Sequence, residues 1–173
     1  MRERLLGVAT SLIVLAGCTG ARLPTKAGVY DVSVQAVQTA RGEIHATYVR
    51  PVQSMHPDCM VVFATGDAGW FGASGALFAH LAAERYTLAG FSAREILKES
   101  VDPGERITTA HAAQGLKELY AHAKRDLGLP DATPIIFVGF SRGASAVVFT
   151  AVHPELRGEV EGSVAIALTR EAD

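Results

Sequence analysis

The sequence predicts an α/β fold, in which a mixed, mostly parallel sheet carries helices on both faces. Two observations support this prediction. Short, continuously apolar runs, typical of strands buried on both faces, alternate along the chain with helical patterns. Two runs of alternating apolar and polar residues precede them and predict an antiparallel hairpin, which makes the sheet mixed.

The N-terminus predicts an export signal that lies outside this fold. Arg2 and Arg4 precede an apolar stretch, Leu5 to Leu15, which is too short to span a bilayer as a finished helix. The run from Leu15 to Cys18 then resembles the lipobox of bacterial lipoproteins, in which the cysteine becomes the lipidated first residue of the mature chain. An ordinary signal peptide with a chance cysteine is the alternative.

These features predict a periplasmic lipoprotein with one folded domain. We expect a lipoprotein signal peptide over residues 1–18, a tether over residues 19–27 and one domain over residues 28–173. A lipid on Cys18 would anchor the chain to a membrane without crossing it. Cys59 is then left without an intramolecular partner, and we expect it to be a small buried hydrophobe rather than a reactive thiol.

The strands and helices are predicted in order from their patterns. Apolar residues at every second position from Tyr30 to Ala36, and again over residues 43–49, predict the hairpin. The apolar run 59–64 predicts a central strand. We then expect a helix over residues 76–83, a strand over 86–91, a polar loop over 92–105 and a long helix over 108–127 that ends at Gly128.

Residues 139–143, Gly-Phe-Ser-Arg-Gly, fit the G-x-S-x-G pattern of a nucleophile elbow. A buried strand over residues 135–138 enters the motif and a helix over residues 143–152 leaves it, before a last strand over residues 160–168. This motif holds a serine hydroxyl at the tip of a tight turn, where glycine on either side avoids crowding. Ser141 is therefore the predicted catalytic nucleophile. A glycine-rich turn without chemistry is the alternative.

An acyl-transfer site also needs two N–H groups that bind the oxyanion. The backbone N–H of Arg142, directly after the nucleophile, is the first candidate. Residues 66–70, Gly-Asp-Ala-Gly-Trp, follow the central strand and supply the second, with Asp67 preferred over Ala68. The alternative for this loop is a plain tight turn with Trp70 packed beneath it.

The element order matches the first six strands of an α/β-hydrolase, and the motifs are similar to one bacterial family of that fold. Residues 61–72, 77–94 and 138–145 resemble the VirJ/AcvB family of virulence-associated α/β-hydrolases, and the likeness covers about residues 58–170. The resemblance implies a periplasmic protein associated with hydrolysis of lysyl-phosphatidylglycerol and with type IV secretion. One departure is the run Glu95-Ile96-Leu97, where some members carry Tyr-Phe-Trp.

The general base and the catalytic acid are the missing parts. In this fold the order is Ser, then Asp or Glu, then His, but His153 is the one histidine that follows Ser141. It lies at the far end of the helix that begins at the elbow, about 18 Å away at 1.5 Å per residue. Asp173 is a weak candidate for the acid. We therefore expect an incomplete α/β-hydrolase domain whose C-terminal part is missing, with activity lowered about 10⁴- to 10⁶-fold.

The predicted function is ester hydrolysis in the cell envelope, on a lipid or small-molecule ester. The alternative is a non-catalytic periplasmic binding protein, an accessory of a secretion system on a hydrolase scaffold. No metal and no organic cofactor are expected. A formal net charge of −2 argues against a nucleic-acid partner, because dedicated nucleic-acid binders carry a basic balance.

Overall fold

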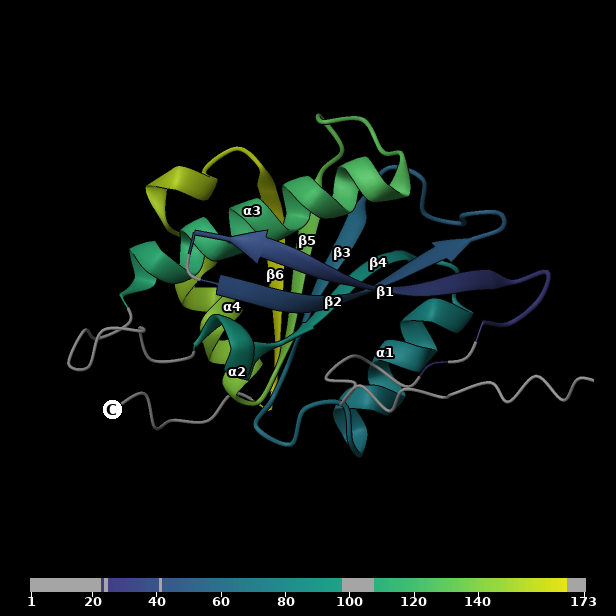
Figure 1. The fold of residues 1–173 in the computed structure, drawn as a ribbon, viewed down its shortest axis with the longest axis horizontal. Helices are drawn as coiled ribbons and strands as arrows, with labels where there is room; N and C mark the ends of the chain where they lie inside the picture. Colours follow the sequence, from purple (N-terminus) through teal and green to yellow (C-terminus); the bar gives the residue numbers. More distant parts are fainter. Residues whose placement is uncertain (1–22, 24, 41, 98–107, 168–173) are drawn as a thin grey trace, which may run out of the picture.

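A computed structural model of the chain describes residues 23, 25–40, 42–97 and 108–167 (Figure 1). The predicted signal peptide, the lipidation site Cys18, most of the tether and the acid candidate Asp173 lie outside the described residues. Within the described residues, no helix is both long and apolar enough to cross a membrane.

The strands form one mixed sheet in the order β1-β2-β4-β3-β5-β6 (Figure 1). The hairpin strands β1 and β2 pair antiparallel, and β2 joins β4 antiparallel, whereas β4, β3, β5 and β6 run parallel. The sheet is therefore mixed and mostly parallel, as predicted. The strands are β1 (Tyr30–Thr39), β2 (Gly42–Pro51), β3 (Met60–Thr65), β4 (Thr87–Ser92), β5 (Ile135–Phe140) and β6 (Val160–Ile166).

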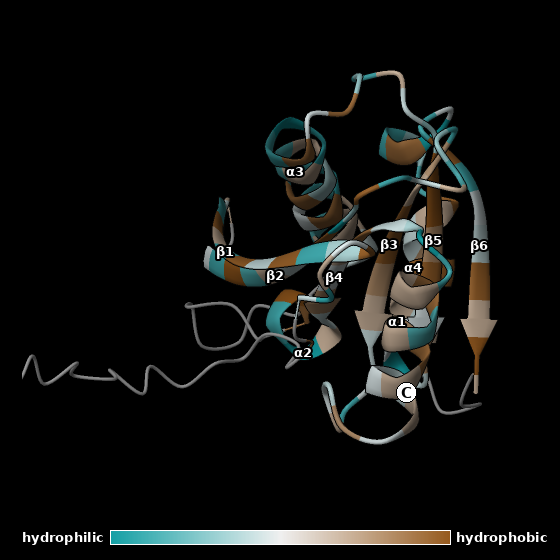
Figure 2. Cartoon of the chain, turned by 90° about the vertical axis from the view of Figure 1, so that its right-hand side faces the viewer, coloured by the Kyte–Doolittle hydropathy of each residue, from teal (hydrophilic) through white to brown (hydrophobic). Residues whose placement is uncertain are grey.

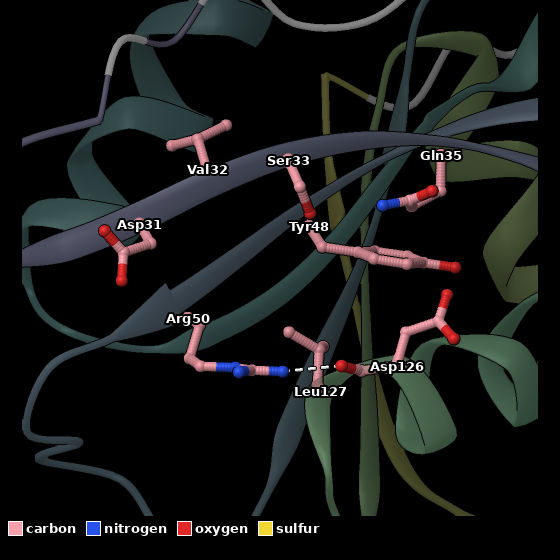
Figure 3. A pocket seen from close by; sticks show the side chains of 8 residues that line it. All are labelled: Asp31, Val32, Ser33, Gln35, Tyr48, Arg50, Asp126 and Leu127. Carbon is pink, nitrogen blue, oxygen red and sulfur yellow. Dashed lines mark hydrogen bonds between the residues drawn. The ribbon is translucent and has the colours of Figure 1, made fainter.

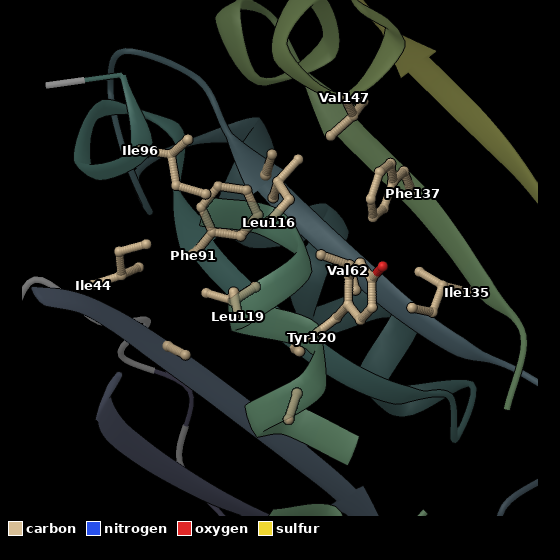
Figure 4. Close-up of a cluster of buried hydrophobic side chains, with 14 of the residues drawn as sticks. Ile44, Val62, Phe91, Ile96, Leu116, Leu119, Tyr120, Ile135, Phe137 and Val147 are labelled. Atoms are coloured by element: carbon tan, nitrogen blue, oxygen red, sulfur yellow. The ribbon is translucent and has the colours of Figure 1, made fainter. Parts of the chain in front are cut away.

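Helices cover both faces of this sheet because the central strand is apolar on both. On β3, Met60 and Val62 face one core cluster, and Val61 and Phe63 face the other. The first cluster packs against α2, α3 and α4 (Figure 4), and the second packs against α1. The helices are α1 (Ala73–Ala83), α2 (Ala93–Ile96), α3 (Thr109–Leu127) and α4 (Arg142–Ala151), with a 3₁₀ turn, η1 (Pro154–Leu156).

The long helix α3 has the termini that the sequence predicts. The Thr108 side chain accepts a hydrogen bond from the backbone N–H of His111, and Gly128 ends the helix in the left-handed conformation with a φ of 70°. The apolar side chains between them, including Leu116, Leu119 and Tyr120, are buried against the sheet.

Four elements differ from their predictions. The helix α1 begins at Ala73 rather than residue 76, and the predicted loop after β4 contains the short helix α2. Strand β5 continues through Gly139 to Phe140, because both residues still pair with β6. On β1 the predicted half-burial is incomplete: Val34 is 47% exposed, since β1 lies at the edge of the sheet.

The other edge of the sheet is β6 (Figure 2). Within the described part of the chain, β6 pairs with β5 alone. Its side chains are intermediate or exposed throughout, and Val164 is 48% exposed. The parallel strands β4, β3, β5 and β6 point the same way, so their carboxyl ends lie side by side. Folds of the α/β class place their sites at these carboxyl ends.

Candidate active site

Ser141 occupies a strained turn between β5 and α4. Its φ is 54° and its ψ is −121°, a conformation that side-chain-bearing residues rarely adopt and that costs about 1–3 kcal/mol. The turn is held by hydrogen bonds from the Ser141 N–H to the carbonyl of Ile166, at 2.8 Å, and from the Ala144 N–H to the Ser141 carbonyl, at 2.9 Å. The surrounding sheet and helix therefore impose the strain.

The two glycines of the motif are required by close backbone contacts. A Cβ atom at Gly139 would lie 2.3 Å from the carbonyl oxygen of Gly143. One at Gly143 would lie 2.4 Å from the carbonyl oxygens of Ala64 and Thr65 on β3. Helix α4 thus begins directly against the end of the neighbouring strand, and any side chain at either position would move Ser141.

The loop after β3 meets the elbow at Gly66. A Cβ atom there would lie 2.9 Å from the Ser141 Cβ, 3.0 Å from the Phe140 carbonyl oxygen and 3.5 Å from the Ser141 Oγ. The loop itself is a tight turn in which the Gly69 N–H donates to the Gly66 carbonyl at 2.9 Å. The predicted oxyanion loop and the predicted nucleophile are therefore in van der Waals contact.

Trp70 fixes the far end of this loop in the core. Its ring lies 5.0 Å from the Phe78 ring and 6.2 Å from the Phe63 ring, measured between centroids. Gly90 leaves room for this packing, because a Cβ atom there would come within 2.6 Å of both Trp70 and Phe78. The tight turn with a packed tryptophan, considered as an alternative for this segment, is present, and it coexists with the contact at Ser141.

Charged side chains link the loop to its surroundings. The Arg142 Nε lies 3.0 Å from the Asp67 Oδ1, and both side chains are more than half exposed. The Arg94 guanidinium, on α2, donates to the Asp67 carbonyl at 3.5 Å. The sequence predicted that Arg142 and Asp67 act through their backbone N–H groups, and it did not predict the ion pair between their side chains. Arg94 was not predicted to reach the loop, since no local pattern connects α2 to a residue 27 positions earlier in the chain.

The structure brings together Ser141, Arg142 and Asp67, with Ala68 next in the same turn. It leaves His153 apart. That residue caps η1, beyond the C-terminus of α4, whereas Ser141 caps the N-terminus of the same helix. Ten helical residues separate the two ends, about 15 Å along the axis.

A cavity of about 230 Å³ lies elsewhere, between the hairpin and the end of α3 (Figure 3). There the Arg50 guanidinium donates to the Asp126 carbonyl. The Tyr48 hydroxyl is buried, and burial together with the Asp126 charge raises its pKa. None of the predicted catalytic residues lines this cavity, so it is separate from the elbow. Its lining residues are Asp31, Val32, Ser33, Gln35, Tyr48, Arg50, Asp126 and Leu127.

The remaining candidate groups for chemistry are metal ligands and the thiol of Cys59. In the described ranges, no three His, Cys, Asp or Glu side chains lie close enough together to hold a metal ion. Cys59 is half-buried just before β3. Burial and the neighbouring Asp58 carboxylate raise the pKa of its thiol, which disfavours the reactive thiolate.

No protein-family model matches the chain, and no curated protein matches it. Solved structures do. The chain superposes on a dienelactone hydrolase-like protein from Klebsiella pneumoniae with a TM-score of 0.62 and 17% identity, covering 83% of this chain and 62% of that one. It superposes on the naproxen esterase (carboxylesterase NP) of Bacillus subtilis with a TM-score of 0.54 and 14% identity, covering 79% and 43%. An esterase of Pyrococcus furiosus gives a TM-score of 0.56 at 17% identity, covering 79% and 51%.

These similarities establish the fold. The chain has the α/β-hydrolase-like architecture that its sequence predicts: a mixed, mostly parallel sheet with helices on both faces. It spans 43% to 62% of the length of these three structures.

Proposed function

We propose that this protein is a serine hydrolase that cleaves esters, with Ser141 as its nucleophile. The observation that carries the proposal is the conformation of Ser141, at a φ of 54° between β5 and α4 and in contact with the loop after β3. Strain of this kind concentrates at functional sites, and the elbow motif places its nucleophile between a buried strand and a helix N-terminus.

The oxyanion would be bound by two backbone N–H groups. Arg142 is the first residue of α4, and the first N–H groups of a helix have no partner within it. In the Gly66–Asp67 peptide the Gly66 carbonyl points into the turn, where it accepts from Gly69. Because a trans peptide directs its N–H opposite to its carbonyl, the Asp67 N–H points out of the turn. This favours Asp67 over Ala68 as the second donor.

The proposed reaction also requires a general base and an acid. Ser141 needs an imidazole to take its proton and a carboxylate to orient that imidazole. His153 is separated from it by the full length of α4. Among the described residues we assign neither the base nor the acid; this chain matches 62% and 43% of the lengths of two of its structural neighbours, which extend beyond the matched region.

The substrate and the location extend this proposal. The motif resemblance to the VirJ/AcvB family supports an aminoacylated phospholipid, such as lysyl-phosphatidylglycerol, as the ester. A lipid anchor on Cys18 would hold the site beside such headgroups at the periplasmic face of a membrane. Replacing Cys18→Ala should then remove the acyl mass and release the protein from the membrane fraction. Unchanged mass and unchanged fractionation would reject the anchor.

A fluorophosphonate probe tests the catalytic proposal on protein expressed from the whole gene. We expect the wild type to be labelled, and Ser141→Ala to abolish labelling. Ser145→Ala is the matched control, since Ser145 lies one turn further along α4, and it should be labelled like the wild type. An unlabelled wild type would reject the hydrolase. It would favour the second candidate, a binding protein of a secretion system built on a hydrolase scaffold.

A further inference from the structure

The two residues proposed to bind the oxyanion through their backbones are also joined through their side chains. The Arg142 Nε lies 3.0 Å from the Asp67 Oδ1, and this ion pair bridges the elbow and the loop after β3. Each residue that is proposed to offer a backbone N–H to the oxyanion therefore also has a charged side chain bound to the other. Exposed ion pairs like this one contribute little to the free energy of unfolding. We therefore ask which groups the pair holds in position.

The loop needs such support because its backbone is soft. Two of its residues, Gly66 and Gly69, are glycines, and Gly69 has a φ of 61°. Gly66 cannot be replaced by a stiffer residue, because a Cβ atom there would meet Ser141 at 2.9 Å. Glycine at position 66 lets the loop approach the nucleophile, but it also leaves the loop backbone with more conformational freedom than another residue would. Trp70 anchors the far end of the loop, beyond Asp67.

A second contact holds Asp67 from the opposite side. Arg94 on α2 donates to the Asp67 carbonyl at 3.5 Å. Helix α2 is itself fixed to the sheet, because the Glu95 side chain, 5% exposed, accepts a hydrogen bond from the backbone N–H of His45 on β2 at 2.7 Å. Ile96 is buried in the core. The Glu95–Leu97 segment, where the sequence differs from some members of the VirJ/AcvB family, therefore anchors the helix that carries Arg94.

We infer that the Asp67–Arg142 ion pair is a positioning device that holds the two oxyanion donors at a fixed separation, with Arg94 fixing the Asp67 peptide from α2. The effect of this ion pair on catalysis rests on the proposed ester hydrolysis. The ion pair itself, called the tie below, is a property of the folded chain. Asp67 and Arg142 act here as positioning residues through their side chains, and their backbone groups act on the substrate.

Amide hydrogen exchange of residues 66–70 in the 173-residue chain tests the tie without any chemistry. We expect Asp67→Asn and Arg142→Gln each to speed exchange about 2- to 5-fold, the effect of losing one exposed ion pair. The exchanged pair, Asp67→Arg with Arg142→Asp, should restore slow exchange. Lys117→Gln is the matched control, since it breaks an exposed pair of similar length, 3.1 Å to Glu159, on a different part of the surface.

Ester hydrolysis by protein from the whole gene tests the consequence. Losing one oxyanion donor costs about 100- to 1000-fold in kcat, so loosening one should cost less, about tenfold, with KM within twofold of wild type. The exchanged pair should recover most of that loss. Unchanged exchange in both single variants, or fast exchange in the exchanged pair, would overturn the inference. A wild type that hydrolyses no ester would reject the proposed function and leave the exchange result to decide the tie.

Discussion

The close approach of α4 to β3 makes a quantitative prediction about two glycines. Gly143→Ala would place a Cβ atom 2.4 Å from the carbonyl oxygens of Ala64 and Thr65, which belong to a central strand and cannot move aside cheaply. Forcing extra volume into such a site costs about 1–3 kcal/mol, and backbone atoms on both sides place this variant at the upper end. Gly115→Ala is the control. Gly115 lies inside α3 with nothing within 4 Å of the added atom, so helix propensity should stabilise that variant by about 0.5–1 kcal/mol.

Glycine-to-alanine substitution is thus expected to change the free energy of unfolding in opposite directions at these two helical glycines. Urea unfolding followed by tryptophan fluorescence measures both, since Trp70 is the single tryptophan and packs in the core beside the loop after β3. Gly143→Ala should lower the midpoint and Gly115→Ala should raise it. If Gly143→Ala unfolds at the wild-type midpoint, α4 does not begin against β3, and the account of the elbow fails with it.

Three further predictions concern titration and capping. Burial raises the pKa of Tyr48 and of Tyr120. The stability that these tyrosines contribute should be complete below about pH 10, the pKa of an unfolded tyrosine. It should decline as the pH rises above that value, because the unfolded state then loses the proton while the folded state keeps it. Urea midpoints from pH 8 to 11 measure this decline, and a midpoint that stays level would contradict it. In a Cys18→Ala background at pH 8, Cys59 should react with iodoacetamide more slowly in the folded chain than in urea, and equal rates would show that its thiol pKa is not raised. Thr108→Ala should cost about 1 kcal/mol by removing the side-chain acceptor at the start of α3, whereas Thr108→Ser should retain most of it.

Elements with strong local signals were predictable from the sequence. The extent of α3 was predicted from its apolar stripe and from a terminal glycine, and Gly128 ends the helix as expected. The central strand followed from an unbroken apolar run, which forms β3 with every residue buried. The elbow followed from five residues in a strand-to-helix setting, and Ser141 adopts the strained φ that the motif requires.

What the sequence could not predict depends on contacts between distant segments. Nothing local shows that Arg94 reaches Asp67, or that Glu95 accepts from the backbone of β2. Helix α2 is four residues long, too short for periodicity to reveal, and it is stabilised by burying Ile96. The exposure of Val34 likewise follows from the position of β1 at the sheet edge, which an alternating pattern does not encode.

The order of strands in the sheet also governs when the site is completed during synthesis. Strand β3 lies between β4 and β5 in the sheet, yet β5 is translated long after β3, with α1, β4, α2 and α3 between them in the chain. Until the codons for residues 135–140 have been read, one side of β3 has no backbone ladder. The nascent chain must therefore close a long loop across its own centre before Gly66 and Ser141 meet. The contact between the elbow and the loop after β3 is for this reason expected to form late in folding, in the same step that completes the middle of the sheet.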